Sequence, residues 1–158
     1  MRGNELKRIV FVCTGNVCRS PMAEYLLRHH LRGDTAFQVD SAGLFAVSGL
    51  PASPAAVEVL REQGINLAPH RSRPLSREMV DGADWIVVMT AGHAKEVVAR
   101  HAAAAGKVRL LTSFGRQTGS GRDISDPIGC SVATYRAIRD EIDAALLDLI
   151  LFLKKGSK

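Results

Sequence analysis

The sequence predicts an α/β protein: a single domain in three layers, with a four-stranded parallel sheet and helices on both faces. Along the chain, short apolar runs alternate with segments of helical periodicity, which is the pattern of parallel α/β folds. The run at residues 85–89 is apolar almost throughout, as expected for a strand that is covered on both sides. Ligands bind to such sheets at the carboxyl ends of the strands.

Each element is placed by its apolar pattern and by the residues that flank it. The expected strands are residues 9–12, 37–41, 85–89 and 108–111. The expected helices are residues 21–31, 54–63, 76–81, 91–104 and a last helix that starts near residue 131. Ser76 is the expected N-cap of the short third helix, and Gly64 is the stop of the second. Residues 112–129 form a polar loop before the last helix.

The length of 158 residues fits one domain, residues 1–158, which ends in a basic tail at residues 154–158. No apolar run approaches the roughly 20 residues of a membrane helix, and the first residues lack the apolar core of a signal peptide. Three cysteines are an odd number without framework spacing, which fits a reducing compartment. We therefore expect a cytoplasmic monomer that binds no membrane.

The formal net charge of +5 allows two interpretations. The basic surface either serves solvation alone or steers an anionic substrate toward the protein. Nucleic-acid binding is not favoured, because the arginines are scattered and do not form a stripe with aromatic residues between them. The histidines lack metal-ligand spacing with a cysteine or carboxylate pair, so no metal site is expected.

The most informative segment is Cys13 to Pro21, which joins the first expected strand to the first helix. The start of a helix presents unpaired N–H groups that suit a phosphate or another oxyanion. Gly15 and Asn16 tolerate the left-handed backbone that a loop around an anion requires. Cys13 supplies a nucleophile, and Arg19 supplies a planar group that can bind two phosphate oxygens. This combination predicts attack on a phosphorus atom; the alternative is a structural junction with two inert cysteines.

Chemistry at phosphorus also needs a proton donor for the leaving group, and Asp126 is the candidate. Pro127 favours an extended conformation at Asp126, in a loop that can fold over a site. Asp123 is the rival carboxylate. Asp-Pro is also a common turn pair, so the alternative is that Asp126 only forms a turn before the last helix.

The segment that begins at Cys13 resembles the active-site loop of the low-molecular-weight protein tyrosine phosphatases, whose pattern is Cys, five residues, Arg and Ser. Further segments are similar to that family in the same order: residues 40–43, 56–65, 70–73, 84–89 and 123–127. The likeness covers nearly the whole chain.

The resemblance implies a phosphoprotein phosphatase that needs no metal or other cofactor and forms a phosphocysteine intermediate on Cys13. Arg19 would hold the phosphoryl oxygens, and Asp126 would act as general acid and then as general base. The implied substrate-binding residues are Thr14, Gly15, Asn16, Val17, Cys18, Ser20, Phe45 and Ile128. Asn16, Ser41 and His70 would support the loop through a network of hydrogen bonds, and Ser20 would hydrogen-bond the Cys13 thiolate. Phosphorylated proteins are the expected partners, and inorganic phosphate or vanadate the expected inhibitors.

Three alternatives stay open at this point. Cys18 either lines the loop as a small buried residue or forms a reversible disulfide with Cys13 that protects the nucleophile from oxidation. A thiol-dependent arsenate reductase shares this loop but would need a further cysteine pair, and Cys130, to which we assign no role, is the one spare cysteine. A non-catalytic phosphate-binding module would need only Arg19 and the loop.

The substrate preference depends on departures from the family pattern. Ile128 and Gly129 stand where many members carry tyrosine, and Phe45 is the expected aromatic wall where many carry tryptophan or tyrosine. Both features resemble a bacterial branch that includes protein arginine phosphatases, but that branch carries threonine at the position of Val17. Because Val17 has no hydroxyl for a guanidinium N–H, phosphotyrosine is the favoured substrate and phosphoarginine the alternative.

Overall fold

Four parallel strands form the sheet of the computed structural model, which describes residues 6–115 and 121–155. The strands lie side by side in the order β2 (Phe37–Gly43), β1 (Lys7–Cys13), β3 (Trp85–Val88) and β4 (Val108–Leu110). Every neighbouring pair is parallel, and the register aligns Cys13 with Gly43 at the carboxyl ends of β1 and β2. The predicted sheet is confirmed.

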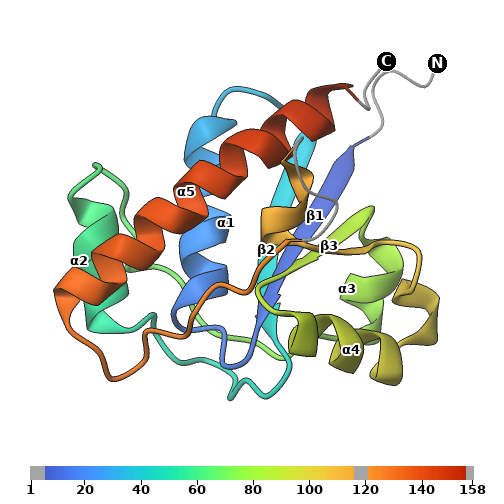
Figure 1. The fold of residues 1–158 in the computed structure, drawn as a ribbon, viewed down its shortest axis with the longest axis horizontal. Coiled ribbons are helices and arrows are strands. Elements are labelled where there is room, and N and C mark those ends of the chain that lie inside the picture. The colour runs from blue at the N-terminus through green and yellow to red at the C-terminus, as the bar shows by residue number, and fades with distance from the viewer. Residues whose placement is uncertain (1–5, 116–120, 156–158) are drawn as a thin grey trace.

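Helices cover both faces of this sheet (Figure 1). One face carries α1 (Arg19–His30), α2 (Pro54–Arg61) and α5 (Val132–Lys155). The other face carries α3 (Arg77–Gly82) and α4 (Ala91–Arg100). Two short 3-10 helices are Ala102–Ala104 after α4 and Leu111–Phe114 after β4. The three-layer arrangement expected from the sequence is therefore also confirmed.

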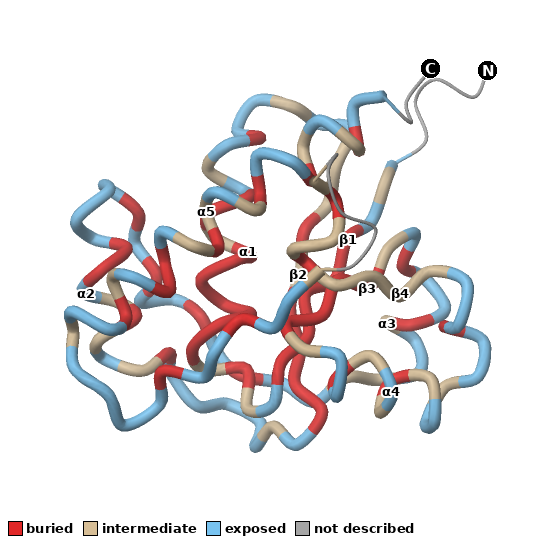
Figure 2. Tube along the Cα trace, in the orientation of Figure 1, coloured by how far each residue is buried: buried red, intermediate tan, exposed pale blue. Residues whose placement is uncertain are grey.

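The sheet divides the apolar core into two clusters, because successive side chains of β1 point to opposite faces. Ile9 and Phe11 pack in the larger cluster with α1 and α5, whereas Val10 and Val12 pack with Val97 of α4. The central strands are buried along most of their length (Figure 2). No helix in the described part of the chain is both long enough and apolar enough to cross a membrane.

Some boundaries differ from the sequence prediction. α4 ends at Arg100 and not at residue 104, because His101 leaves the helical conformation with φ −137° and ψ 85°. α1 begins at Arg19, so Pro21 lies in its first turn, where the missing N–H costs no helical hydrogen bond. Residues 111–114 form a 3-10 helix and not the end of a strand and the start of a loop.

Two expected segments fall only partly within the described residues. Residues 116–120 of the expected polar loop lie outside them, as do residues 156–158 of the expected basic tail. The remaining tail residues, Lys154 and Lys155, belong to the last turn of α5.

An aromatic cluster lies at the end of the sheet where β3 begins, away from Cys13. Trp85, the only tryptophan of the chain, meets Phe152 of α5 edge to face, with ring centroids 5.3 Å apart. Phe114 lies 5.0 Å from Phe152, and the Arg109 guanidinium stacks over all three rings. These contacts hold the C-terminal half of α5 against the sheet.

Candidate active site

Residues 14–18 form the turn that connects Cys13, at the end of β1, to α1. Asn16 has φ 59° and is the only non-glycine residue with a positive φ within residues 6–115 and 121–155. Gly15, the other residue of the turn whose type tolerates the left-handed conformation, is not among the glycines with positive φ. One left-handed residue is enough to form the turn. Asparagine tolerates this conformation, and the Asn16 side chain is anchored below the turn.

The chain that follows β2 presses against this turn. A Cβ on Gly43 would lie 2.6 Å from the carbonyl oxygen of Thr14, so only glycine permits this approach. The next two residues bond to the turn: Leu44 N–H donates to the Cys13 carbonyl at 3.0 Å, and Phe45 N–H donates to the Thr14 carbonyl at 2.9 Å. The backbone of one strand end thus fixes the position of the other.

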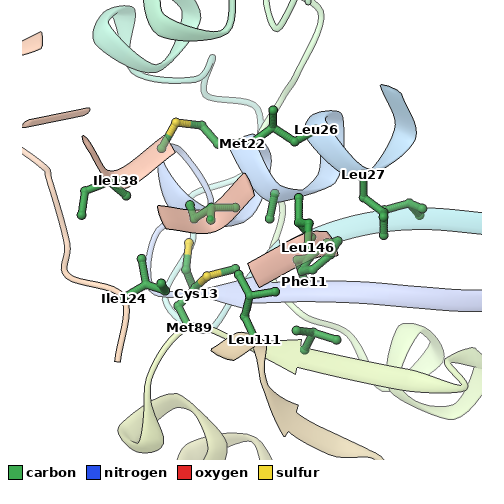
Figure 3. Packing of buried hydrophobic residues seen from close by; sticks show 14 of the residues in the cluster. Phe11, Cys13, Met22, Leu26, Leu27, Met89, Leu111, Ile124, Ile138 and Leu146 are labelled. Carbon is green, nitrogen blue, oxygen red and sulfur yellow. The ribbon is translucent and has the colours of Figure 1, made fainter. Parts of the chain in front are cut away.

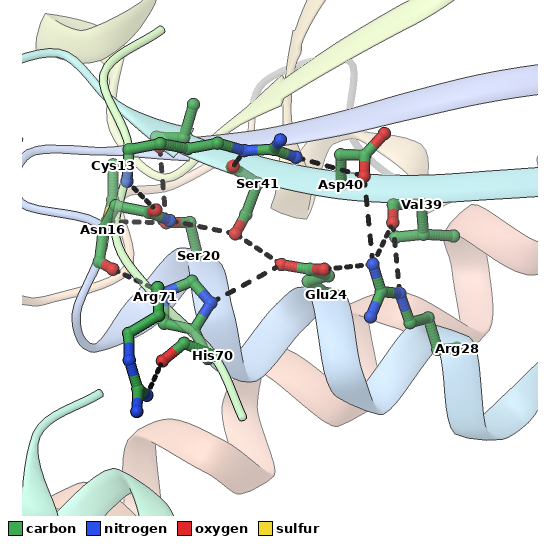
Figure 4. A network of polar contacts seen from close by, with 12 residues as sticks. Cys13, Asn16, Ser20, Glu24, Arg28, Val39, Asp40, Ser41, His70 and Arg71 are labelled. Carbon is green, nitrogen blue, oxygen red and sulfur yellow. Dashed lines mark hydrogen bonds and ion pairs between the residues drawn. The ribbon is translucent and has the colours of Figure 1, made fainter. Parts of the chain in front are cut away.

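A buried polar network supports the turn from below (Figure 4). Asn16 is fully buried, and its side-chain Nδ2 donates to Ser20 Oγ at 2.8 Å and to Ser41 Oγ at 2.9 Å. Ser41 in turn donates to Glu24 Oε1 at 2.5 Å. His70 donates from Nε2 to the Asn16 carbonyl at 2.8 Å, because a carbonyl can only accept. The structure therefore brings together Asn16, Ser41 and His70, as expected.

The direction of these hydrogen bonds determines whether Ser20 can donate to Cys13. Both Nδ2 hydrogens of Asn16 are used, so Ser20 Oγ accepts one of them and keeps its own hydrogen. Ser20 Oγ lies 2.9 Å from Cys13 Sγ and 3.5 Å from the Ala42 carbonyl, so the sulfur is the nearer of its two possible acceptors. Ser20 is therefore set to donate to a Cys13 thiolate. The sulfur itself lies at the edge of the larger apolar cluster, beside Met89 and Ile124 (Figure 3).

Glu24 completes this network, and the sequence analysis missed it. Its side chain is 6 % exposed and pairs with the Arg28 guanidinium at 2.5 Å. Burial raises the pKa of the Glu24 carboxyl, which the hydrogen bond from Ser41 and the charge of Arg28 oppose. Glu24 lies one helical turn after Ser20 on the inward face of α1, and a carboxylate on that face was the available signal.

Arg19 spans the site. Its Nη1 donates to the Ile124 carbonyl at 2.9 Å, and its Nη2 lies 3.5 Å from the Asp126 carboxylate. The Nε–H is buried and has no hydrogen-bond partner within the described ranges. Because a buried N–H without a partner is costly, this donor is suited to an oxygen of a bound anion.

The two candidate carboxylates, Asp126 and Asp123, contact different parts of the structure. Asp126 is 46 % exposed, faces Arg19, and accepts a hydrogen bond from Ile128 N–H at 3.0 Å. Asp123 accepts from Ala91 N–H at 2.9 Å and so caps the start of α4. The structure therefore favours Asp126 as the acid that reaches the site and gives Asp123 a structural contact.

A pocket of about 200 Å³ opens between the turn and the Asp126 loop. Its lining residues are Cys13, Thr14, Gly15, Val17, Cys18, Arg19, Asp126 and Ile128. Asn16 and Ser20, which were expected to bind substrate, lie buried behind it, because their side chains are used in the network. Phe45, the expected aromatic wall, does not line the pocket; its exposed ring lies 4.4 Å from the Arg100 guanidinium on α4.

The second cysteine of the turn has an environment of its own. Cys18 Sγ lies 3.2 Å from the Tyr135 hydroxyl of α5 and 3.4 Å from Ser53 Oγ. Burial raises the pKa of the Cys18 thiol, and burial together with Cys18 raises the pKa of Tyr135 to about 12. Cys13, Cys18 and Cys130 are all free thiols here, and Cys130 is exposed. A Cys13–Cys18 disulfide remains an untested prediction.

The fold and the pocket together define a cysteine-dependent phosphatase with a parallel α/β sheet. Residues 8–158 match the family model described as low molecular weight phosphotyrosine protein phosphatase. The chain is 45 % identical over 140 residues to a protein-arginine-phosphatase of Geobacillus stearothermophilus, covering 88 % of this chain and 90 % of that one. It is 47 % identical over 122 residues to the probable low molecular weight protein-tyrosine-phosphatase EpsP of Ralstonia solanacearum, covering 77 % and 79 %.

A solved structure agrees with these sequence matches. The YwlE arginine phosphatase from Geobacillus stearothermophilus superposes with a TM-score of 0.88 at 42 % identity and covers 95 % of this chain and 94 % of its own. The chain therefore belongs to the low-molecular-weight protein tyrosine phosphatase family, and it is an enzyme of the phosphatase class.

Proposed function

We propose that this enzyme hydrolyses phosphotyrosine monoesters in proteins, with Cys13 as nucleophile, Arg19 as phosphoryl-binding group and Asp126 as general acid and base. The observation that carries the proposal is that these three residues line one pocket of about 200 Å³. The pocket lies at the carboxyl end of β1 and at the start of α1, where N–H groups and the helix dipole favour an anion.

The first step transfers the phosphoryl group to the enzyme. The Cys13 thiolate attacks phosphorus, an S–P bond forms, and the bond from phosphorus to the ester oxygen breaks. Asp126, as the carboxylic acid, gives its proton to the departing oxygen. Arg19 holds two phosphoryl oxygens, and Ser20 donates a hydrogen bond to the sulfur when it carries negative charge.

The second step releases phosphate. Asp126, now a carboxylate, takes a proton from water, whose oxygen attacks phosphorus while the S–P bond breaks. The products are inorganic phosphate and the Cys13 thiolate. Asp126 is partly exposed, which lets water reach it in this step. Inorganic phosphate should compete with substrate, because it fits the same oxygen-binding groups.

The choice of phosphotyrosine rests on Val17. Val17 lines the pocket and offers methyl groups, which suit an aromatic ring and leave a phosphoguanidinium N–H without a partner. The second candidate is phosphoarginine, which the name of the relative that is 45 % identical favours. Ile128 also favours phosphoarginine. This exposed residue lines the pocket at the position where many tyrosine phosphatases of the family carry tyrosine.

A side-by-side assay on phosphotyrosine and phosphoarginine peptides tests this choice. The parent enzyme should have the higher kcat/KM for phosphotyrosine. Val17→Thr adds a hydroxyl in the pocket and should shift the ratio toward phosphoarginine by about tenfold, since an unpaired buried polar group costs roughly 1–3 kcal/mol. Val17→Ala is the matched control, because it changes size without adding a hydroxyl. A parent enzyme that already prefers phosphoarginine contradicts the proposed substrate.

A further inference from the structure

His93, in the first turn of α4, contacts the turn that follows Cys13. Its Nε2 lies 2.9 Å from Thr14 Oγ1, across 79 positions of the sequence. The His93 side chain is 8 % exposed, and its backbone N–H is fixed by Thr90 Oγ1, the N-cap of α4. A rigid helix end therefore holds the imidazole against the residue that comes directly after the nucleophile.

The second ring nitrogen of His93 indicates which nitrogen carries the proton. Nδ1 is buried and has no hydrogen-bond partner in the ranges that the structure describes. A buried N–H without a partner is rarer than a buried acceptor without one, so the proton of the neutral ring belongs on Nε2. Burial and the nearby Arg19 charge lower the pKa of His93 from 6.5 to about 4, which keeps the ring neutral at physiological pH.

This tautomer determines what the Thr14 hydroxyl can do. A hydroxyl has one hydrogen to donate and two lone pairs that accept. Because Nε2–H of His93 donates to Oγ1, Thr14 keeps its own hydrogen. Thr14 lines the catalytic pocket beside Cys13 and Arg19, and its carbonyl is already held by Phe45 N–H.

We propose that His93 is a positioning residue that, by donating to Thr14, leaves the Thr14 hydroxyl hydrogen free to bond an oxygen of the phosphoryl group in the pocket. Thr14 then adds a side-chain donor to the backbone N–H groups and Arg19. The inference rests on the phosphatase activity but not on the choice of substrate, because phosphotyrosine and phosphoarginine share the phosphoryl oxygens. The opposite tautomer would make Thr14 an acceptor, which suits the N–H of phosphoarginine and not a phosphoryl oxygen.

Calorimetric binding of inorganic phosphate tests this directly, together with kcat and KM for a simple aryl phosphate. Thr14→Val should weaken phosphate binding about tenfold, in the range of one hydrogen bond to a charged group, whereas Thr14→Ser should bind as the parent does. His93→Leu should weaken binding about threefold to tenfold. His93→Gln should restore it, because its side-chain N–H can take the place of Nε2–H. His101→Gln, at the far end of α4, is the matched control and should change nothing.

The double variant separates positioning from mere packing. In the Thr14→Val background, His93→Leu should have no further effect on phosphate binding, because the group it positions is gone. Equal losses in both backgrounds, or parent-like phosphate binding by Thr14→Val, would overturn the inference. If His93→Leu fails to fold, His93→Ala, which also removes the donor, takes its place in both backgrounds. Thr14→Val that loses only phosphoarginine turnover would establish the acceptor role instead. Failure to hydrolyse phosphotyrosine would refute the proposed substrate and leave the phosphate result valid.

Discussion

The turn that carries Cys13 and the loop that carries Asp126 face each other across the pocket, but they are held in different ways. The cysteine turn rests on Asn16, which bonds the buried side chains of Ser20, Ser41 and His70 and accepts from the backbone N–H of Arg73. The Asp126 loop is held through the backbone of Ile124, whose N–H donates to the Met89 carbonyl and whose carbonyl accepts from Arg19. Asp126 itself is half exposed, two residues beyond that anchor.

The difference matches what each group must do. An anion cradle works only if its donors keep fixed positions, so a network without solvent access suits it. An acid that gives its proton to a leaving group and takes one from water needs contact with solvent. Arg19 joins the two regions, because it belongs to α1 and bonds the backbone of the other loop.

The largest expected effect comes from replacing the two charged or nucleophilic residues that flank the turn, Cys13 and Arg19. Cys13→Ser should abolish hydrolysis of an aryl phosphate, while inorganic phosphate still binds, because the cradle and Arg19 remain. Steady-state assays and calorimetry measure the two outcomes. Arg19→Lys should lose both activity and binding, since a point charge cannot replace the planar guanidinium. Residual turnover by Cys13→Ala, which leaves no nucleophilic side chain at this position, would show that another group is the nucleophile.

The next effect belongs to the exposed loop. Asp126→Asn should lower kcat by about two to four orders of magnitude, and by less with leaving groups that need no proton. Asp123→Asn is the matched variant: its amide oxygen can still accept from Ala91 N–H at the start of α4, so it should leave both the fold and kcat nearly unchanged. If Asp123→Asn is the more damaging change to kcat, the two carboxylates have been assigned in the wrong order.

A smaller effect on kcat is expected from removing Glu24, which supports the turn from below. Glu24→Ala removes the acceptor for Ser41 and should lower kcat about tenfold, in the range of one buried hydrogen bond to a charged group. Glu24→Gln keeps an acceptor oxygen and should retain most of the activity. The control is Asp143→Ala, a half-buried carboxylate that pairs with His30 outside this network and should leave kcat unchanged. Unchanged kcat in Glu24→Ala would mean that the turn keeps its shape without the network.

The smallest effect is on the pH dependence of stability. Between pH 6.5 and 4 the unfolded chain binds a proton at His93 that the folded protein, with its lowered pKa, does not bind. The free energy of unfolding should therefore fall as the pH is lowered through this range, by at most about 1.4 kcal/mol per pH unit from this group. His93→Gln should reduce that slope in thermal melts, and an unchanged slope would contradict the neutral, buried state of the ring.

The sequence predicted the parts of the molecule that are encoded locally. The sheet, its helices and the segment from Cys13 to Arg19 could be predicted because each lies in one continuous stretch with its own pattern. Ser41 and His70 came from the family resemblance, and the structure places both against Asn16. The predicted end of α4 was wrong, because no glycine or proline in the sequence marks the point at His101 where the chain leaves the helical conformation.

The missed residues join segments that are distant in the sequence. Glu24 had a signal, since it is a charged residue on the inward face of α1. His93 had none, because a histidine in the first turn of a helix is unremarkable until the fold brings it to Thr14. Phe45 was predicted from the family resemblance to be the aromatic wall, but its exposed ring lies against Arg100 and is not among the residues that line the pocket.

The position of Trp85 has a practical consequence for measurements on this enzyme. Trp85 pairs with Ile9 in the sheet register, four residues before Cys13, which places it about 13 Å from the end of the strand at roughly 3.3 Å per residue. Its ring reports on the contact between Phe152 of α5 and the sheet. The intrinsic fluorescence of this single indole should therefore change on unfolding and stay constant when phosphate enters the pocket. Stability and ligand binding can then be recorded independently on the same sample.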